Sequence, residues 1–273
     1  MTAALIAEHP GLQDALGGTP SCWAMYRVAR KLREHRPALN ACLDACAASL
    51  RAQHPDMGRD VAIDATDIPA WGNGQRFMMR GGPESEKFSD PDASWGHRSA
   101  LATRGAGSFY GFKLHAAICT ETGLPLAWEV ATGKRHESNF VAPLIVALNA
   151  RGYTPQTVAC DKAYDNTRVY SEIEQRSCDP VIPLRGAKGK QVPLPVTVGG
   201  RLFPRIGRHT DRFERLYKRR VMAEREFGRL KHEHGLATLR VRGLAKVQQH
   251  VDLTMLGRLS QALLRSRAVP LAA

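Results

Sequence analysis

The sequence lacks the long apolar runs of a membrane protein: none approaches the roughly 20 residues that are needed to span a bilayer. It also lacks internal repeats and low-complexity segments. Its first residues, MTAALIAEHPGLQDALGG, have neither the basic stretch nor the long apolar core of a signal peptide. We therefore expect a globular cytoplasmic protein with no membrane partner.

Cysteine motifs and a phosphate-binding loop are missing too. The six cysteines are scattered, and Cys42 and Cys46 are one helical turn apart, which suits neither a zinc knuckle nor a redox motif. The basic GAKGK run at 186–190 lacks the full spacing of an ATP-binding loop. We expect cysteines that act as small buried hydrophobic residues in a reducing compartment, and no ATP site.

Acidic residues are few relative to basic ones. The 273 residues include 39 Lys and Arg but only 26 Asp and Glu, which gives a net charge of +13 and a pI near 9.8. One stretch, 201–246, holds 14 Lys and Arg against 5 Asp and Glu and so carries +9 of that charge. An excess this localised indicates a polyanionic partner.

The hydrophobic pattern predicts a helical N-terminal segment, 1–56, followed by an α/β domain, 57–265. The arginines of the first segment indicate either an accessory DNA-binding region or a solvated helix face, and the sequence leaves both open. In the second we expect a mixed sheet flanked by helices, with strand ends presenting carboxylates at one edge. The expected strands are 59–68, 157–161 and 179–184, with a hairpin at 109–132; the expected helices are 138–152, 166–177, 211–236 and 246–267; long loops are expected at 72–108 and 185–210.

Two aspartates end strand-like runs. Asp64 follows the apolar run in VAIDATD, and Asp161 follows TVAC. An aspartate at the end of a buried strand is often only a cap for the next turn. Asp67 is the alternative to Asp64, although it would lie on the opposite face if the strand continues. Asp165 is expected to be the N-cap of the helix that follows it.

The long basic helix predicted at 211–236 carries a third carboxylate. At about 100° per residue, Tyr217, Arg220, Glu224 and Lys231 fall within one narrow arc of that helix. A carboxylate beside a phenol, a guanidinium and an ammonium suits a site that holds a divalent metal next to a phosphate backbone. Three converging carboxylates are what a pair of hard cations needs for in-line attack on a phosphodiester.

His115 is the one histidine that alternates with apolar residues of a predicted strand, in FKLHAA. A core or edge histidine is the favoured interpretation there over a metal ligand.

The ordered set of motifs resembles the DDE transposases of bacterial insertion sequences. The matching segments are IDATD, SDPDASWG, YGFKLH with TGLPL, HESNF and ACDKAYDN, followed by the Tyr–x2–Arg–x3–Glu–x6–Lys signature at 217–231. Each segment is weak alone, but they recur in the family's order over roughly residues 60–260 and end in a four-residue signature at the right spacing.

The resemblance implies a ribonuclease-H-like core and a metal-dependent transposase acting on double-stranded DNA in the bacterial cytoplasm, associated with the nucleoid. It implies that Asp64, Asp161 and Glu224 form the catalytic triad that binds Mg²⁺ or Mn²⁺. It further implies a homodimer when two transposon ends are paired. The residues implied in contacts with transposon-end DNA are Tyr217, Arg220 and Lys231.

Two departures from the family keep other functions open. The segment between Asp161 and Glu224 is too short for the β-rich insertion found in some relatives, and little sequence precedes the first helix. A family member often carries a fuller N-terminal domain for end recognition, so we expect this copy to be shortened there. The alternatives to an active transposase are an inactive remnant that only binds DNA and a ribonuclease-H-like nuclease without strand transfer.

Overall fold

The computed structural model of the protein describes residues 6–72, 74, 77–78, 86–87, 89–98, 105–186 and 199–267. Its chain divides into two compact units, Met1–Leu43 and Asp44–Ala273. This division falls inside the N-terminal helical segment that the sequence predicts.

The N-terminal unit is helical. It contains α2 (Pro10–Leu16), α3 (Cys22–Glu34) and the first part of α4 (Arg36–Gln53). The Ser21 hydroxyl accepts a hydrogen bond from the Ala24 amide and so caps α3. No residue of α3 is buried.

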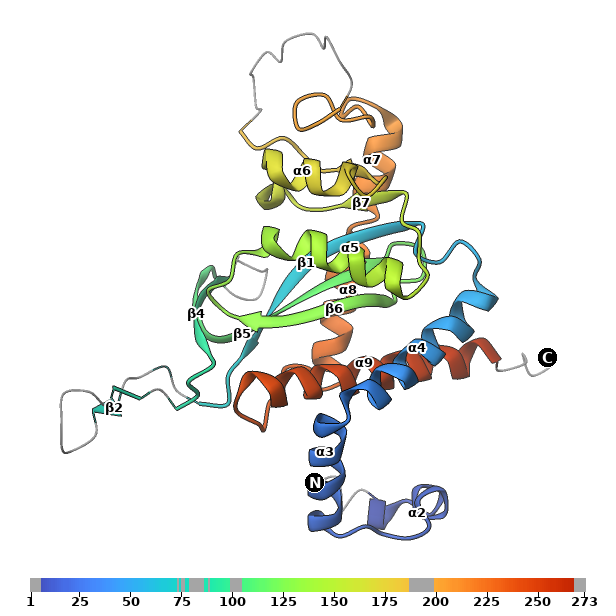
Figure 1. Cartoon of the computed structure of the whole chain (residues 1–273), viewed down its shortest axis with the longest axis vertical. Coiled ribbons are helices and arrows are strands. Elements are labelled where there is room, and N and C mark those ends of the chain that lie inside the picture. The colour runs from blue at the N-terminus through green and yellow to red at the C-terminus, as the bar shows by residue number, and fades with distance from the viewer. Residues whose placement is uncertain are drawn as a thin grey trace. The chain divides into compact units, whose positions relative to one another are not determined.

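The second unit is built on a mixed sheet with the strand order β4-β5-β1-β7-β8 (Figure 1). β6 pairs with residues 112–118 of β5. β1 is antiparallel to β5 and parallel to β7, which is parallel to β8. The curled mixed sheet flanked by helices confirms the α/β class and the ribonuclease-H-like fold. The strands are β1 (Asp60–Pro69), β4 (Ser94–Arg98), β5 (Gly107–Cys119), β6 (Pro125–Thr132), β7 (Thr157–Ala159) and β8 (Asp179–Val181), with a separate pair β2 (Phe77–Met78) and β3 (Glu86–Lys87).

The helices that cover the sheet follow the sequence pattern closely. The helix expected at 138–152 is a 3-10 turn, η1 (Glu137–Phe140), that leads into α5 (Val141–Ala150). α5 and α9 (Leu244–Arg267) both pack against β6, and α6 (Thr167–Glu174) packs against α5 and β8. Their inward faces bury apolar side chains such as Leu144, Leu148, Val251 and Met255. The hydrophobic core therefore lies between these helices and the sheet.

Two sequence predictions were wrong in detail. The segment 72–108 was expected to be loop, but β4 lies within it and pairs with β5 from Ser94 to Arg98; much of the rest of that segment lies outside the described residues. The helix predicted at 211–236 is two helices, α7 (Asp211–Lys218) and α8 (Val221–His232). Arg219 and Arg220 form the turn between them, and the amides of Arg220 and Ala223 each bond a carbonyl three residues back, as in a 3-10 turn.

Candidate active site at the open edge of the central strand

The central strand β1 has one edge that is only partly paired. β5 pairs with it from Val61 to Pro69, whereas β7 pairs with it only from Asp60 to Ala62. Asp64 therefore lies in the middle of β1 rather than at its end, two residues beyond the last pair with β7. The edge left open there is where side chains from other elements meet Asp64.

Asp161 lies two residues beyond the end of β7 and lines the same cavity as Asp64. Its carboxylate accepts a hydrogen bond at 2.7 Å from the Ala163 amide and caps the 3-10 helix η2 (Lys162–Tyr164). The capping role considered for Asp161 is thus real, and the residue also lines a cavity that contains Asp64. This cavity of about 170 Å³ is lined by Asp64, Ala65, Thr66, Asp67, His97, Arg98, Lys113, Glu137, Asp161 and Lys231.

Burial raises the pKa of Asp64 to about 7. The hydrogen bond from the Ala65 amide, at 2.8 Å, and the Arg220 guanidinium oppose this rise, and the negative charges of Asp161 and Glu137 add to it. A carboxyl group whose ionised form is this poorly solvated gains from any cation that binds beside it.

Arg220 lies between two members of the expected triad. Its Nη1 donates to Asp64 Oδ2 at 3.0 Å, and its Nη2 donates to Glu224 Oε1 at 2.5 Å. The Arg220 guanidinium also lies 5.7 Å from the ring centroid of Tyr217, within range of a cation–π contact. The side chain of Glu224 is 55% exposed, and Glu224 does not line the cavity of Asp64.

Lys231 lies at the Asp67 side of the cavity. Its Nζ is 3.0 Å from Asp67 Oδ1, and both side chains line the cavity wall. Despite the break in the helix, Arg220 contacts both Tyr217 and Glu224, while Lys231 lies farther along α8 and contacts Asp67 instead. Asp67, the alternative to Asp64, is buried and bound to the Lys231 ammonium.

The structure adds charged residues that the sequence pattern did not single out. Glu137 and Lys113 form an ion pair at 2.7 Å in the cavity, and Arg98 of β4 also lines it. Glu137 lies in HESNF, one of the segments that carried the resemblance, so its place in that segment could have identified it. Arg98 belongs to a strand within a segment expected to be loop, and no periodicity marked it.

The carboxylates of the site supply the oxygen ligands that Mg²⁺ and Mn²⁺ prefer. Among the described residues, however, no three His, Cys, Asp or Glu side chains lie close enough together to hold a metal ion. Asp64 and Asp161 share the cavity, while Glu224 is bound to Arg220. The oxygen donors are of the type that a divalent cation takes, but in this arrangement the guanidinium of Arg220 is the cation that contacts Asp64.

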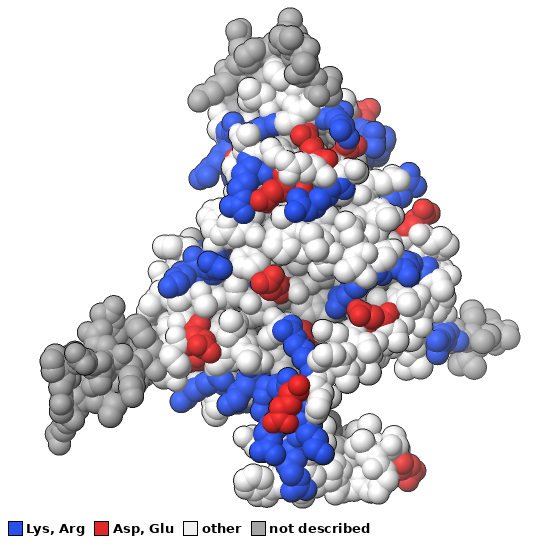
Figure 2. All heavy atoms as spheres, viewed as in Figure 1, with Lys and Arg blue, Asp and Glu red and all other residues white. Residues whose placement is uncertain are grey.

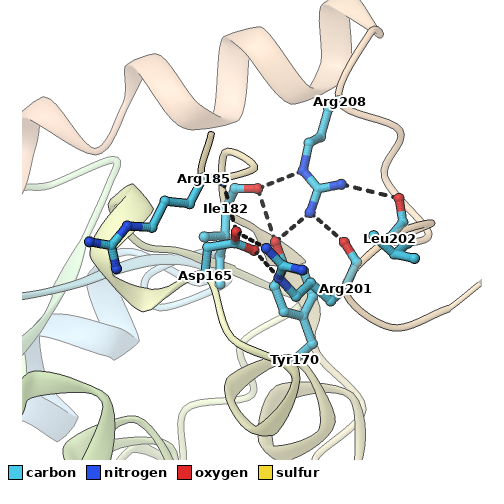
Figure 3. Close-up of polar contacts among 7 residues, drawn as sticks. All are labelled: Asp165, Tyr170, Ile182, Arg185, Arg201, Leu202 and Arg208. Carbon is cyan, nitrogen blue, oxygen red and sulfur yellow. Dashed lines mark hydrogen bonds and ion pairs between the residues drawn. The ribbon is translucent and has the colours of Figure 1, made fainter. Parts of the chain in front are cut away.

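Asp165 was expected to cap α6, but Asn166 does so, through a hydrogen bond from the Val169 amide. Asp165 instead accepts two hydrogen bonds from Arg201, at 2.9 and 2.7 Å, and one from the Arg185 amide (Figure 3). Those hydrogen bonds hold the pKa of Asp165 below its usual range, although burial acts in the opposite direction.

Arg208 extends the contacts around Asp165. It donates to the Tyr170 hydroxyl and to backbone carbonyls of Ile182, Arg201 and Leu202 (Figure 3). These contacts fix the segment that leads into α7 against α6 and the chain beyond β8. They position the start of α7, whose cap is Thr210.

His115 belongs to the core, as the sequence favoured. It is fully buried and stacks on Phe140, with ring centroids 3.7 Å apart. Burial lowers its pKa to about 3, and the nearby Lys113 charge acts in the same direction. A neutral ring at this position is consistent with a packing role.

Comparison with known proteins bears on the same part of the chain. The sequence model of the family described as "Transposase DDE domain" matches residues 55–258, about three quarters of the chain. No curated protein sequence matches it. None of the helices in the described ranges has both the length and the apolar character to cross a membrane.

Proposed function

The chain belongs to the DDE transposase family, and we propose that it cleaves DNA at the ends of an insertion sequence and joins the freed 3′-hydroxyl to target DNA. One observation carries the proposal: Asp64 on β1 and Asp161, which follows the parallel neighbour β7, line one cavity that also contains Arg98, Lys113 and Lys231. Hydrolysis and strand transfer both place an attacking oxygen in line with a leaving oxygen at one phosphodiester. A single acidic site can therefore serve both steps.

Asp64 and Asp161 would hold a divalent cation, Mg²⁺ or Mn²⁺, with Glu224 as the third ligand. Bound there, such cations would stabilise the charge on the attacking and leaving oxygens. Arg220 now contacts both Asp64 and Glu224. Glu224 can therefore join Asp64 at a shared ion only when the Arg220 guanidinium moves, and a DNA phosphate is the natural new partner for it.

The cations around the cavity would position the DNA. Lys231 and Arg98 line it, and Arg220 borders it through Asp64. Lys231 supplies a flexible point charge, whereas Arg220 supplies a planar fork that matches two phosphate oxygens. The Tyr217 ring lies beside the Arg220 guanidinium and would limit the directions in which it can swing.

The surface of the N-terminal helix α3 favours an accessory role in DNA binding over the alternative of a face that is only solvated. Lys and Arg side chains gather over α3 in Figure 2. Trp23 and Tyr26 are 70% and 53% exposed, and at about 100° per residue they share a face with Arg27 and Arg30. Exposed aromatic rings between cations are suited to stacking and phosphate contact together.

Two alternatives remain distinct from this proposal: a remnant that only binds DNA, and a nuclease without strand transfer. The presence of both Asp64 and Asp161 in one cavity favours an active enzyme over the remnant. Pairing of two DNA ends would require two copies of the chain, so we also propose a homodimer in the DNA-bound state.

The test uses the full chain and duplexes that carry the ends of its own insertion sequence, with Mg²⁺ or Mn²⁺. Cleavage to a 3′-hydroxyl and its joining to a second duplex would support the proposal. Cleavage without joining would identify a nuclease, and binding without cleavage a remnant. Undiminished cleavage in EDTA would exclude the metal-dependent mechanism.

A further inference from the structure

A second and larger cavity, of about 390 Å³, lies at the other end of β1 from Asp64. It is bordered by Asp60 and Thr157, the first residues of β1 and β7. One of its walls is formed by α7. The lining contains four arginines: Arg59, Arg212, Arg215 and Arg219.

Three of these arginines occupy one face of α7 and the turn that follows it. Arg212, Arg215 and Arg219 are spaced by three and four residues, which aligns their side chains along the helix. Arg219 is 3.4 Å from Asp60 Oδ2. In the part of the chain that the structure describes, Arg212 and Arg215 form no hydrogen bond or ion pair through their side chains, and both are exposed.

The acidic residues of the lining leave a positive balance. Asp56 faces Arg59 at 3.7 Å, and Asp60 is bound by Arg219 and by the Thr157 hydroxyl. Among the described residues of the lining, the charged groups without a partner are then the Glu121 carboxylate and the guanidiniums of Arg212 and Arg215. Two free cations and one carboxylate favour a singly charged anion, and a phosphodiester of the DNA backbone carries one negative charge.

The turn between α7 and α8 connects this cavity to the acidic site. Arg219 contacts Asp60, and the next residue, Arg220, contacts Asp64. Asp60 and Asp64 are four residues apart on β1, which corresponds to about 13 Å along the strand. Phosphates of one DNA strand succeed each other about every 3.4 Å along the duplex axis. If the duplex axis runs along β1, a DNA backbone that passes Arg220 reaches the arginine cavity about four nucleotides farther on.

We propose that the cavity lined by Arg59, Arg212, Arg215 and Arg219 binds backbone phosphates of the duplex on one side of the reacting phosphodiester, about four or more nucleotides away. The location of that phosphodiester at Asp64 rests on the proposed function. Arg212 and Arg215 make the contact, while Arg59 and Arg219 are held in place by Gln156 and Asp60. The cavity contributes affinity and register, without reading bases.

The first test compares the salt dependence of DNA binding, measured without divalent cations so that it does not depend on cleavage. In R212A/R215A the slope of log affinity against log salt should fall by about 0.9 for each phosphate that is no longer bound. The matched control K218A/R225A removes the same charge from exposed positions outside the cavity and should keep the wild-type slope. R212K/R215K retains the charge and should keep most of the wild-type slope. An unchanged slope in R212A/R215A, or an equal fall in the control, overturns the proposal.

The second test shortens the duplex from each end in turn. Wild-type affinity should drop when the segment beyond about four nucleotides on one side is removed, and R212A/R215A should show no such drop. Equal losses in both proteins would place the contact elsewhere. Titration with inorganic phosphate completes the comparison. Suppose that the wild type binds phosphate, that R212A/R215A does not, and that the two proteins show the same salt dependence of DNA binding. The cavity would then be a site for small anions, and the DNA assignment would be overturned. Failure of the wild type to cleave DNA would count against the proposed function alone.

Discussion

Asp60 at the start of β1 and Asp64 in its middle each lie beside an arginine, but the two pairs differ in their surroundings. Asp64 lies in a cavity that it shares with Asp161 and Glu137, and burial raises its pKa to about 7. Asp60 accepts a hydrogen bond from the Thr157 hydroxyl at 2.6 Å and faces Arg219 on a wall rich in arginine. The same residue type on the same strand thus has two different environments.

The difference follows from how far β7 pairs with β1. Where β7 pairs with β1, the sheet is closed and Asp60 is satisfied by a hydroxyl and a guanidinium. Where that pairing ends, the open edge brings four carboxylates, Asp64, Asp67, Glu137 and Asp161, into one cavity with Arg98, Lys113 and Lys231. The first arrangement favours holding a phosphate through its arginines, and the second favours recruiting a cation.

The largest expected effect separates the two aspartates. Asp64→Asn preserves shape but removes a charged ligand, so cleavage should fall by about a thousandfold or more, the equivalent of about 4 kcal/mol of transition-state stabilisation. Asp60→Asn is the matched control and should reduce cleavage by less than about tenfold. Rates measured with Mg²⁺ at saturating DNA, together with melting curves for both variants, decide the comparison. Equal rates for the two variants would contradict the assignment of Asp64.

Glu224→Gln tests whether the third carboxylate serves chemistry rather than DNA binding. We expect cleavage to fall by about a hundredfold or more, because a ligand to the shared ion is lost. DNA affinity should hold or rise slightly, because a negative charge beside the phosphate backbone is removed. The control Glu214→Gln changes an exposed carboxylate of α7 that pairs with Lys218 and should leave cleavage intact. Normal cleavage by Glu224→Gln would remove it from the triad.

The raised pKa of Asp64 predicts a pH-dependent cost to stability. Because the folded state holds this proton more tightly than the unfolded state does, the contribution of Asp64 is fully favourable below its ordinary pKa of 3.8 and is lost as pH rises to about 7. The full rise corresponds to at most about 4 kcal/mol. Asp64→Asn should therefore gain stability over the wild type in urea unfolding at pH 8 and little at pH 4.

A divalent cation provides the control for that measurement. Mg²⁺ should stabilise the wild type at pH 8, where Asp64 is ionised, and should have much less effect on Asp64→Asn. An advantage of the variant that is the same at both pH values would show that the titration of Asp64 is not its cause.

Much of the fold followed from sequence because its features are local. Alternation and turn residues marked the β5–β6 hairpin, and the apolar runs marked β1 and β7. β4 was not predicted, because a short strand with polar and glycine residues shows no hydrophobic periodicity and its pairing with β5 depends on the tertiary fold. The break in the helix at Arg219 and Arg220 was not predicted either. Each of these residues favours a helix, and only their contacts with β1 set them apart from other helical residues.

The sequence could propose which residues form a site, but it could not predict their contacts. Motif order selected Asp64, Asp161 and the signature residues, but periodicity could not show that Arg220 would lie between Asp64 and Glu224. Asp165 is a residue type that often caps a helix, yet Asn166 caps α6. Asp165 instead binds Arg201, which is distant in sequence. Such contacts depend on segments far apart in sequence, which no local pattern encodes.

The smallest expected effect concerns Lys231, and it tests whether the cavity of Asp64 also binds phosphate. Lys231→Ala should lower the slope of log affinity against log salt by about 0.9, one phosphate contact. A competing explanation is that Lys231 only balances Asp67, which it contacts at 3.0 Å. The double variant Lys231→Ala/Asp67→Asn removes both charges of that pair. If Lys231 binds DNA, the double variant should recover stability but keep the reduced slope. If the pair is only structural, the slope should stay at the wild-type value in both variants, and Lys231 would have no part in phosphate binding.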